Sequence, residues 1–239
     1  MNWKNEITKK LNCEYPIIQA PMFGVTTPEM VAAASATRCI GALPLGDLPV
    51  EKCAAVIRAT KKISDRPFIV NLFVNAIPPL TETLRLKYSA TKQFIERLAQ
   101  ENDLAARLPS IDELVLSDYH DQLDAVMDEH CKLISFTFGV LDEPSVKKLK
   151  NTGAILIGTC TSVSEAKMLE ASGIDIICVQ GIEAGGHRGS FLQEDIPQIG
   201  GFSLLSRVRE TVSVPLIYAG GIYNAKTLIA SRTLGAQGF

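Results

Sequence analysis

The sequence Ile174-Asp-Ile-Ile-Cys-Val179 is followed directly by Gln180-Gly-Ile-Glu-Ala-Gly-Gly-His-Arg-Gly-Ser190, and this junction indicates the fold. The first six residues form an apolar run with the length of a buried parallel strand. The chain then becomes polar and glycine-rich within one residue, and glycine lets backbone N–H groups approach a ligand closely. Such a loop after a parallel strand is where α/β proteins place their chemistry. His187 lies in it and is a candidate catalytic residue, with a solvated histidine in a surface turn as the alternative.

Apolar runs of strand length recur along the chain and alternate with stretches of helical character. The runs cover residues 16–20, 39–43, 67–73, 132–137, 153–158, 174–179 and 214–219. Seven regular alternations predict parallel strands joined by right-handed crossovers. Their number favours a (β/α)8 TIM barrel over an open sheet. Residues 235–239 are typical of the lead-in to an eighth strand, so we expect the barrel to stop before or within that strand.

Residues 76–130 depart from this alternation. They contain a Pro-Pro pair and two charged helical stretches, which is more than one crossover helix needs. We therefore expect a helical insertion of two or three helices between the third and fourth strands, of the kind that forms lids or interfaces. His120 and His130 lie in it at no metal-ligand spacing, and we expect both to be solvated.

Composition excludes several classes of protein. The 239 residues are 46% hydrophobic and carry a net charge of −2, which leaves no basic footprint for nucleic acid. No apolar run is long enough to span a membrane, and the charged first ten residues do not form a signal peptide. The six cysteines are scattered without a C-x-x-C pair, which predicts reduced thiols. We expect a single domain over 1–239 in a cytoplasmic protein without a metal ion, a nucleic-acid partner or a membrane partner.

Three of the expected strand ends carry groups suited to a phosphorylated planar cofactor. Gly220-Gly221 follow the seventh strand and precede a helix, where backbone N–H groups and the helix dipole favour a phosphate. Asn71 ends the third strand and Gln180 the sixth, and their carboxamides can both donate to and accept from a heterocycle. In a barrel these ends meet on one face although they are far apart in sequence.

Five motifs in this order resemble the nitronate monooxygenase family, formerly called 2-nitropropane dioxygenases. They are Gln19-Ala-Pro-Met22, Asn71-Leu-Phe, Ser135-Phe-Thr-Phe-Gly139, Gln180-Gly-Ile-Glu-Ala-Gly-Gly-His-Arg-Gly189 and Ala219-Gly-Gly-Ile222. The resemblance covers essentially the whole chain and implies an FMN-dependent TIM barrel. Members of that family continue through the eighth strand into a further helical region, so the resemblance predicts that this part is missing here and that two sheet edges are open.

The resemblance also implies the chemistry and its residues. It predicts oxidative denitrification of alkyl nitronates or nitroalkanes with O2, with His187 as the catalytic base or proton donor. The FMN-binding residues that it implies are Ala20, Pro21, Met22, Asn71, Gln180, Gly185, Gly186, Gly220 and Gly221. The expected partners are a small-molecule substrate and O2, with a homodimer as the candidate assembly.

Two other functions compete with this one. An FMN-dependent enoyl-[acyl-carrier-protein] reductase shares the barrel and the Gly-Gly-His loop but takes hydride from a nicotinamide. A truncated barrel without catalytic activity is the third hypothesis.

Neighbouring residues have two interpretations each. Arg188 either assists an anion or is solvated, and Glu183 either orients His187 or, as we rank first, supports the loop. Cys160 follows the fifth strand and is expected to be a packed thiol, while Glu165 is expected in the first turn of the next helix.

Overall fold

The computed structural model describes residues 2–114, 116–192 and 196–239 and divides into two units. Unit 1 comprises residues 1–75 and 118–239, and unit 2 comprises residues 76–117. The strands of unit 1 are β1 (Gly41–Gly46), β2 (Phe68–Phe73), β3 (Leu133–Thr137), β4 (Ile155–Cys160), β5 (Ile176–Gln180) and β6 (Leu216–Ala219). The helices of unit 1 are α1 (Glu6–Leu11), α2 (Pro28–Ala36), α3 (Val50–Ile63), α5 (Tyr119–Asp128), α6 (Glu143–Asn151), α7 (Val163–Ala171), α8 (Gly201–Arg209) and α9 (Ala225–Thr233).

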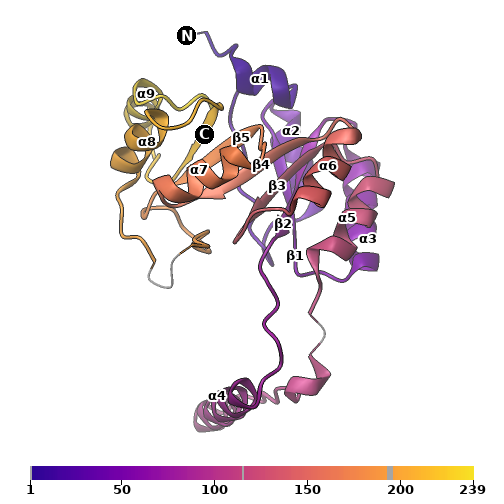
Figure 1. Ribbon diagram of the computed structural model, residues 1–239. Helices are drawn as coiled ribbons and strands as arrows, with labels where there is room; N and C mark the ends of the chain where they lie inside the picture. The colour runs from indigo at the N-terminus through magenta and orange to yellow at the C-terminus, as the bar shows by residue number, and fades with distance from the viewer. Residues whose placement is uncertain (1, 115, 193–195) are drawn as a thin grey trace. The chain divides into compact units, whose positions relative to one another are not determined.

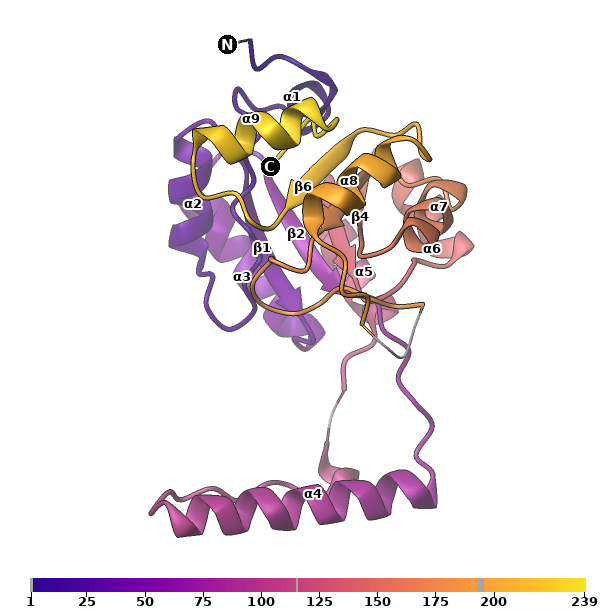
Figure 2. The same cartoon turned by 90° about the vertical axis from the view of Figure 1, so that its left-hand side faces the viewer.

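The six strands form one parallel sheet in the order β1-β2-β3-β4-β5-β6 (Figures 1 and 2). Two short segments continue it: Ile18 forms a parallel bridge with Ile40, and Gly238 forms one with Ile217. The two segments also bond to each other, because Ile18 N–H donates to Phe239 O at 2.7 Å and Phe239 N–H donates to Pro16 O at 2.8 Å. The ring of eight is thus closed at the amino ends of its strands.

This closure confirms the barrel prediction and refines the expectation at its edges. Residues 16–20 and 235–239 were expected to give a first strand and the lead-in to an eighth, and each contributes a single bridge. The two edges expected to be open are therefore joined at one end by main-chain bonds. Toward the carboxyl ends of the strands, the described residues form no further main-chain hydrogen bonds between residues 16–20 and 235–239.

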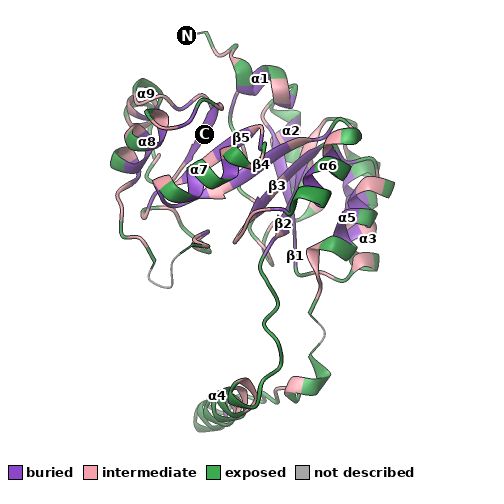
Figure 3. Ribbon diagram, viewed as in Figure 1, coloured by how far each residue is buried: buried purple, intermediate pink, exposed green. Residues whose placement is uncertain are grey.

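Alternation along each strand separates an inner from an outer core, since successive side chains point to opposite faces. The inner core consists mainly of strand residues and of the plug formed by α1, whose Ile7 and Leu11 are fully buried. Its strand members include Ala42, Ile69, Leu133, Ile157, Ile176 and Ile217. The outer core joins the opposite strand faces to the surrounding helices, and Figure 3 shows buried strands beneath half-exposed helices. Each fully buried Leu or Ile contributes about 1.5–3 kcal/mol relative to exposure.

Local signals fix the helix starts. Thr27 caps α2 by accepting from Met30 N–H, with Pro28 in the first turn, and Ser162 caps α7 by accepting from Glu165 N–H. The helix α1 was not foreseen; it begins at a capping box formed by Asn5 and Thr8.

Unit 2 is smaller than the predicted insertion. It contains α4 (Glu82–Glu101) and the short 3-10 helix η1 (Ile111–Glu113), held together by an Arg85–Asp112 ion pair of 2.8 Å and by the Tyr88 hydroxyl donating to Pro109 O. The second predicted helical stretch, α5, instead packs in unit 1 against α3 and β2 and serves as the crossover to β3. The departure from the barrel therefore covers 76–117 rather than 76–130.

No helix in the described ranges combines the length and apolar character that crossing a bilayer requires.

Candidate active site

The inside of the barrel changes from apolar to polar along the strands. Toward the amino ends of the strands, the side chains that point inward are Ile69, Leu133, Ile157 and Ile176. Above, at the carboxyl ends, the same face carries Asn71, Ser135, Thr137, Thr159 and Gln180. Asn71 pairs in register with Ser135, and its Nδ2–H donates to Ser135 Oγ at 2.8 Å. Among the described inner positions of these strands, the hydrogen-bonding side chains therefore gather at the carboxyl-end rim, where TIM barrels act.

The glycine-rich loop begins at Gln180, the last residue of β5. The Gln180 side chain turns back over the loop, with Nε2–H donating to His187 O at 3.0 Å and Oε1 accepting from Gly189 N–H at 2.9 Å. Gly189 itself packs against the strands, because a Cβ there would lie 2.7 Å from Thr137 Oγ1 and 2.9 Å from a Thr159 methyl carbon. Position 189, where the loop returns to the strands, therefore has no room for a side chain.

His187 is exposed at this rim, and its imidazole packs against two phenyl rings that also contact each other. Its ring lies 5.6 Å, centroid to centroid, from Phe73 and the same distance from Phe138, edge-on in both cases. The two phenyl rings contact each other at 4.9 Å, and Phe73 also contacts Phe23 at 5.7 Å. Phe23 follows the segment at residues 16–20, and Phe73 ends β2. Phe138 follows β3, and His187 lies in the loop after β5. They join loops that are distant in sequence into one surface.

Phe138 adopts a left-handed backbone conformation with φ +70°. A bulky residue rarely tolerates this region, and such strain of about 1–3 kcal/mol gathers at functional sites. The next residue has no room for a side chain, because a Cβ on Gly139 would lie 2.0 Å from Val74 O. The sequence offered no signal for this conformation at a phenylalanine.

Glu183 supports the loop rather than His187. Both of its carboxylate oxygens accept from Gly201 N–H, at 2.9 and 3.1 Å. Gly201 begins α8, whose N-cap Gly200 has no side chain to satisfy that donor. A carboxylate at this position also complements the helix dipole. This is the role that we ranked first for Glu183 from the sequence.

Glu165 is a buried anchor that sequence reasoning missed. Its carboxylate is completely buried and accepts from Thr161 N–H and Oγ1–H at 2.6 and 2.8 Å. It also accepts from Phe191 N–H at 2.8 Å and Leu192 N–H at 3.3 Å. The sequence showed only a capping pattern local to α7, whereas the carboxylate holds the segment that leaves the glycine-rich loop.

Arg188 turns inward under the loop instead of being solvated. Its Nη1 donates to Gly181 O, and its Nε and Nη2 are buried without a partner among the described residues. Burial lowers the pKa of the Arg188 guanidinium, while the charges of Glu165 and Glu183 oppose that effect. The half-buried guanidinium is thus influenced by the charges of two carboxylates.

The turn after β6 lies against the same loop. Gly220 and Gly221 have φ values of +117° and +65°, which residues with a Cβ rarely adopt. A Cβ on Gly220 would lie 2.9 Å from Ala184 N, so the two loops touch. The helix α9 follows, with Asn224 as its N-cap. The structure therefore brings Gly220 and Gly221 beside the loop of Gln180, Gly185, Gly186 and His187.

The turn after the first strand joins this surface through Phe23. Ala20 and Met22 are exposed, and Met22 N–H donates to Thr26 Oγ1 at 3.1 Å. Phe23 packs on Gly46 at the end of β1, where a Cβ would lie 2.4 Å from its ring, and contacts Phe73. Ala20, Pro21 and Met22 thus lie at the rim with Asn71, but no hydrogen bond joins them to the glycine-rich loop in the described residues.

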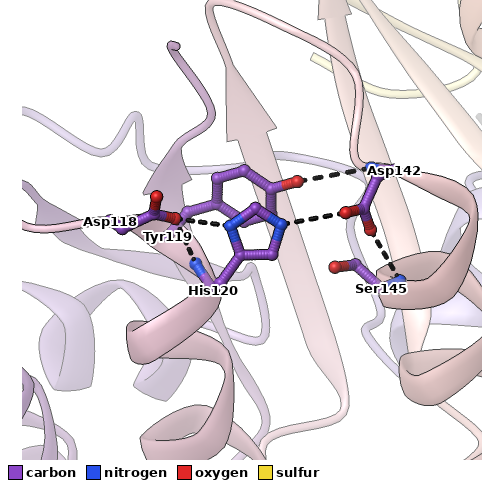
Figure 4. Close-up of polar contacts among 5 residues, drawn as sticks. All are labelled: Asp118, Tyr119, His120, Asp142 and Ser145. Atoms are coloured by element: carbon purple, nitrogen blue, oxygen red, sulfur yellow. Dashed lines mark hydrogen bonds and ion pairs between the residues drawn. The ribbon is translucent and has the colours of Figure 1, made fainter. Parts of the chain in front are cut away.

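His120 is exposed, as expected, and its imidazole is also bonded on both sides (Figure 4). Its Nδ1 lies 2.5 Å from Asp118 Oδ1, and its Nε2 lies 2.9 Å from Asp142 Oδ2. Asp118 and Asp142 are the N-caps of α5 and α6, and Tyr119 stacks on the imidazole with 3.9 Å between ring centroids. The Asp142 carboxylate, followed by the Asp118 carboxylate, raises the pKa of His120. Hydrogen bonding to Ser145, then to His120, lowers the pKa of Asp142 to about 2.

Two further features lie outside the candidate site. Cys160 is fully buried, and burial raises the pKa of its thiol well above the usual range, which fits a packed thiol. A cavity of about 330 Å³ lies at the amino ends of the strands, lined among others by Cys13, Arg38 and Arg66. It is at the opposite end of the barrel from His187, at the face that TIM barrels use for stability.

Comparison with known proteins agrees with this geometry. The family profile described as nitronate monooxygenase matches residues 4–239. The chain belongs to the nitronate monooxygenase family. It is 36% identical over 242 residues to a "Probable nitronate monooxygenase" of Staphylococcus aureus, covering 98% of this chain and 65% of that protein. A protein of the same name from Staphylococcus saprophyticus is 35% identical and is covered to 66%. The chain thus spans about two thirds of the length of these family members.

Solved structures confirm the barrel. A nitroalkane oxidase from Streptomyces ansochromogenes superposes with a TM-score of 0.85 at 30% identity, covering 98% of this chain and 66% of that one. FabK from Thermotoga maritima, as the M276A mutant, gives 0.73 at 23% identity, covering 98% and 63%. The second likeness shows a shared fold.

Proposed function

We propose that this chain oxidises alkyl nitronates or nitroalkanes with O2, using FMN bound over the carboxyl ends of the barrel strands. The observation that carries the proposal is the position of His187, an exposed imidazole in the glycine-rich loop that packs against the touching rings of Phe73 and Phe138. Membership of the nitronate monooxygenase family and the nitroalkane oxidase neighbour support the choice of reaction.

The residues at the rim fit a phosphorylated flavin. Cβ atoms built on Gly185 and Gly186 would meet nothing within 4 Å, so the loop backbone borders open space. The Gly220-Gly221 turn precedes α9, where main-chain N–H groups and the helix dipole favour a phosphate. We assign the phosphate to this turn and the ring system to the rim bordered by Asn71. Ala20, Pro21 and Met22 would flank the flavin, and Gly185, Gly186 and Gln180 belong to the loop beside it.

The protein residues would supply position, charge and proton transfer. When bound, the flavin would accept electrons from the substrate and pass them to O2. His187 as a neutral imidazole can remove the α-proton of a nitroalkane, and as an imidazolium it can pair with a nitronate anion. The two phenyl rings pack against one side of the imidazole and limit its rotation, while its other side stays open to a substrate. A substrate carbon would bind between His187 and the flavin.

Three measurements on the 239-residue chain test the proposal. Quenching of FMN fluorescence measures cofactor binding, O2 consumption with a nitronate measures oxidation, and nicotinamide oxidation with a crotonyl thioester tests the reductase alternative. We expect FMN binding, O2 consumption and no nicotinamide oxidation. A chain that binds no FMN would instead support an inactive barrel.

His187→Asn separates the two roles of the imidazole. We expect turnover of a neutral nitroalkane to fall by about 10²-fold or more, the scale of general base catalysis. The preformed nitronate, which has no α-proton to remove, should lose less. His130→Asn is the matched control, because His130 is exposed, remote from the rim and has φ +52°, which asparagine tolerates. Equal losses with both substrates would remove the role of base from His187.

A further inference from the structure

We propose that an apolar cavity beside Phe23 binds the alkyl group of the substrate, and that the enzyme therefore prefers unbranched nitro compounds of several carbons. This inference rests on the proposed function and names its substrate class. None of the residues that line the cavity is among those that the family resemblance implies for the cofactor or for proton transfer.

The cavity lies between the turn that follows residues 16–20, the strand β1 and the helix α3, and it has a volume of about 330 Å³. Pockets that hold small molecules have volumes of about 300–1,000 Å³. Its apolar side chains include Phe23, Val25, Leu43, Pro44, Leu48 and Val56. Among the described residues that line it, none carries a charge. The cavity therefore suits a hydrocarbon and not the nitronate group, which is an anion.

The two hydroxyl groups in the lining are already used by the protein. Thr26 Oγ1 accepts from Met22 N–H at 3.1 Å and donates to Ala20 O at 3.4 Å. Thr27 Oγ1 accepts from Met30 N–H at 3.3 Å as the cap of α2. A ligand in the cavity would therefore bind chiefly by removing apolar surface from water, which is the contribution that an alkyl group makes.

Phe23 connects the cavity to the candidate base. Its ring forms a wall of the cavity and lies 5.7 Å from the ring of Phe73, centroid to centroid, and Phe73 lies 5.6 Å from His187. Both phenylalanines are partly exposed, and His187 is exposed. An alkyl group whose reacting carbon lies at the open side of His187 can therefore run along the two phenyl rings into the cavity. Because two ring contacts separate the imidazole from the cavity wall, an alkyl group of one or two carbons is too short to enter.

The walls of the cavity are held in place without a ligand. The Phe23 ring packs on Gly46, where a Cβ would lie 2.4 Å from it. The buried Gln122 side chain of α5 donates through Nε2 to Gly46 O at 3.1 Å and to Leu48 O at 2.8 Å. Val25, which lines the same cavity, is 60% exposed, so the cavity opens to solvent. Preformed apolar walls beside exposed apolar surface are typical of a ligand site.

The proposal predicts how the rate depends on the length of the alkyl group. O2 consumption gives kcat/KM for the nitronates of unbranched primary nitroalkanes from nitroethane to nitrooctane, with the 239-residue chain reconstituted with FMN. We expect kcat/KM to rise about threefold for each methylene group that enters the cavity, the scale of burying one CH2, and to level off when the cavity is full. A kcat/KM that varies by less than about threefold over the whole series would overturn the proposal.

Val25→Asp and Val56→Phe test the cavity itself. Aspartate places a charge where the cavity opens to solvent, and phenylalanine fills its interior. Each should lower the ratio of kcat/KM for nitrooctane to that for nitroethane by at least about tenfold. Ile63→Asp is the control, because Ile63 ends α3, is 50% exposed and does not line the cavity. If Val56→Phe does not fold, an unchanged ratio in Val25→Asp, at an exposed position, still overturns the proposal.

A binding measurement without FMN separates this proposal from the proposed function. Nitrohexane should shift the NMR methyl resonances of Val25 and Leu48, assigned by substitution of each residue, whereas nitroethane should not. Unshifted resonances of both residues would overturn the proposal. If the chain binds no FMN or oxidises no nitronate of any length, the proposed function fails, while the methyl resonances still decide whether the cavity holds an alkyl group.

Discussion

The imidazole of His187 lies edge-on to the phenyl ring of Phe138, with 5.6 Å between the ring centroids, and Phe138 holds a left-handed backbone with φ +70°. A strained residue in contact with the candidate base indicates that the ring is needed at that place. Phe73 completes the contact from the end of β2. The segment after β3 and the loop after β5 are therefore in contact at the rim.

Phe138→Asn tests this contact. Asparagine tolerates the left-handed region, so the turn is kept while the phenyl wall is lost. We expect turnover of a nitroalkane to fall about tenfold, since His187 gains freedom of position. Steady-state O2 consumption measures the effect, with Phe94→Asn in α4 of unit 2 as the control. Unchanged turnover would show that the phenyl ring does not position His187.

Glu165→Gln tests the buried anchor of the loop. An amide in place of the carboxylate puts a donor against the N–H groups of Thr161 or Phe191, and one set of bonds is lost. We expect the free energy of unfolding to fall by about 3 kcal/mol, as for a buried partner removed from a charged network. Urea denaturation measures this loss. The control Glu143→Gln, whose side chain is 78% exposed, should change the free energy by no more than about 0.5 kcal/mol.

The His120 cluster predicts a pH-dependent contribution to stability. The folded-state pKa of His120 is raised above its ordinary value of 6.5, so this stabilisation is complete below about pH 6.5 and is lost as the pH rises through the folded pKa. The folded-state pKa of Asp142 is lowered from 3.8 to about 2, so its contribution is present above 3.8 and is lost as the pH falls through about 2.

Denaturation of His120→Gln from pH 4 to 9 measures this contribution. The loss should be largest between about pH 4 and 6.5 and should stay below about 1 kcal/mol, because the His120 side chain is 50% exposed. It should diminish at higher pH. His130→Gln is the control, and a loss independent of pH would contradict an ionic role for His120.

Gly201→Ala tests the close contact beneath the loop. A Cβ at this position would lie 2.1 Å from the Tyr218 hydroxyl oxygen. We expect a loss of about 1–3 kcal/mol from overpacking. Adding Tyr218→Phe removes the oxygen at 2.1 Å but keeps the ring carbons at 2.7 and 2.8 Å, so Gly201→Ala should cost about 1 kcal/mol less in that background and still destabilise. Additive losses in this double-mutant cycle would show that the clash lies elsewhere.

Sequence patterns were sufficient for the barrel because its strands are short apolar runs bounded by glycine, proline and cap residues. The predicted strands at 67–73, 174–179 and 214–219 correspond to β2, β5 and β6 within three residues. The carboxyl-terminal end of the insertion was harder to predict from the sequence, because α5 is about as charged as α4. Its contacts with α3 and β2 assign α5 to the barrel. Helical character alone does not show which unit a helix packs against.

The candidate site was predictable in its location but not in its bonding. Parallel strands bring Asn71, Gln180, His187 and Gly220 to one rim, as expected. Glu165 and His120 bond to partners 26 and 22 residues away in sequence. Phe138 has an unusual backbone angle. Local sequence patterns carry neither kind of information. The same limit applies to Gln180, whose residue type suits a flavin equally well as a loop.

The most direct test of the proposed reaction is anaerobic mixing of an alkyl nitronate with the chain reconstituted with FMN. The absorbance band at about 450 nm, which belongs to the oxidised flavin, should bleach within the turnover time and return when O2 is admitted. A protein that binds FMN but whose band stays unchanged with nitronate, and bleaches only with a reduced nicotinamide, would contradict nitronate oxidation.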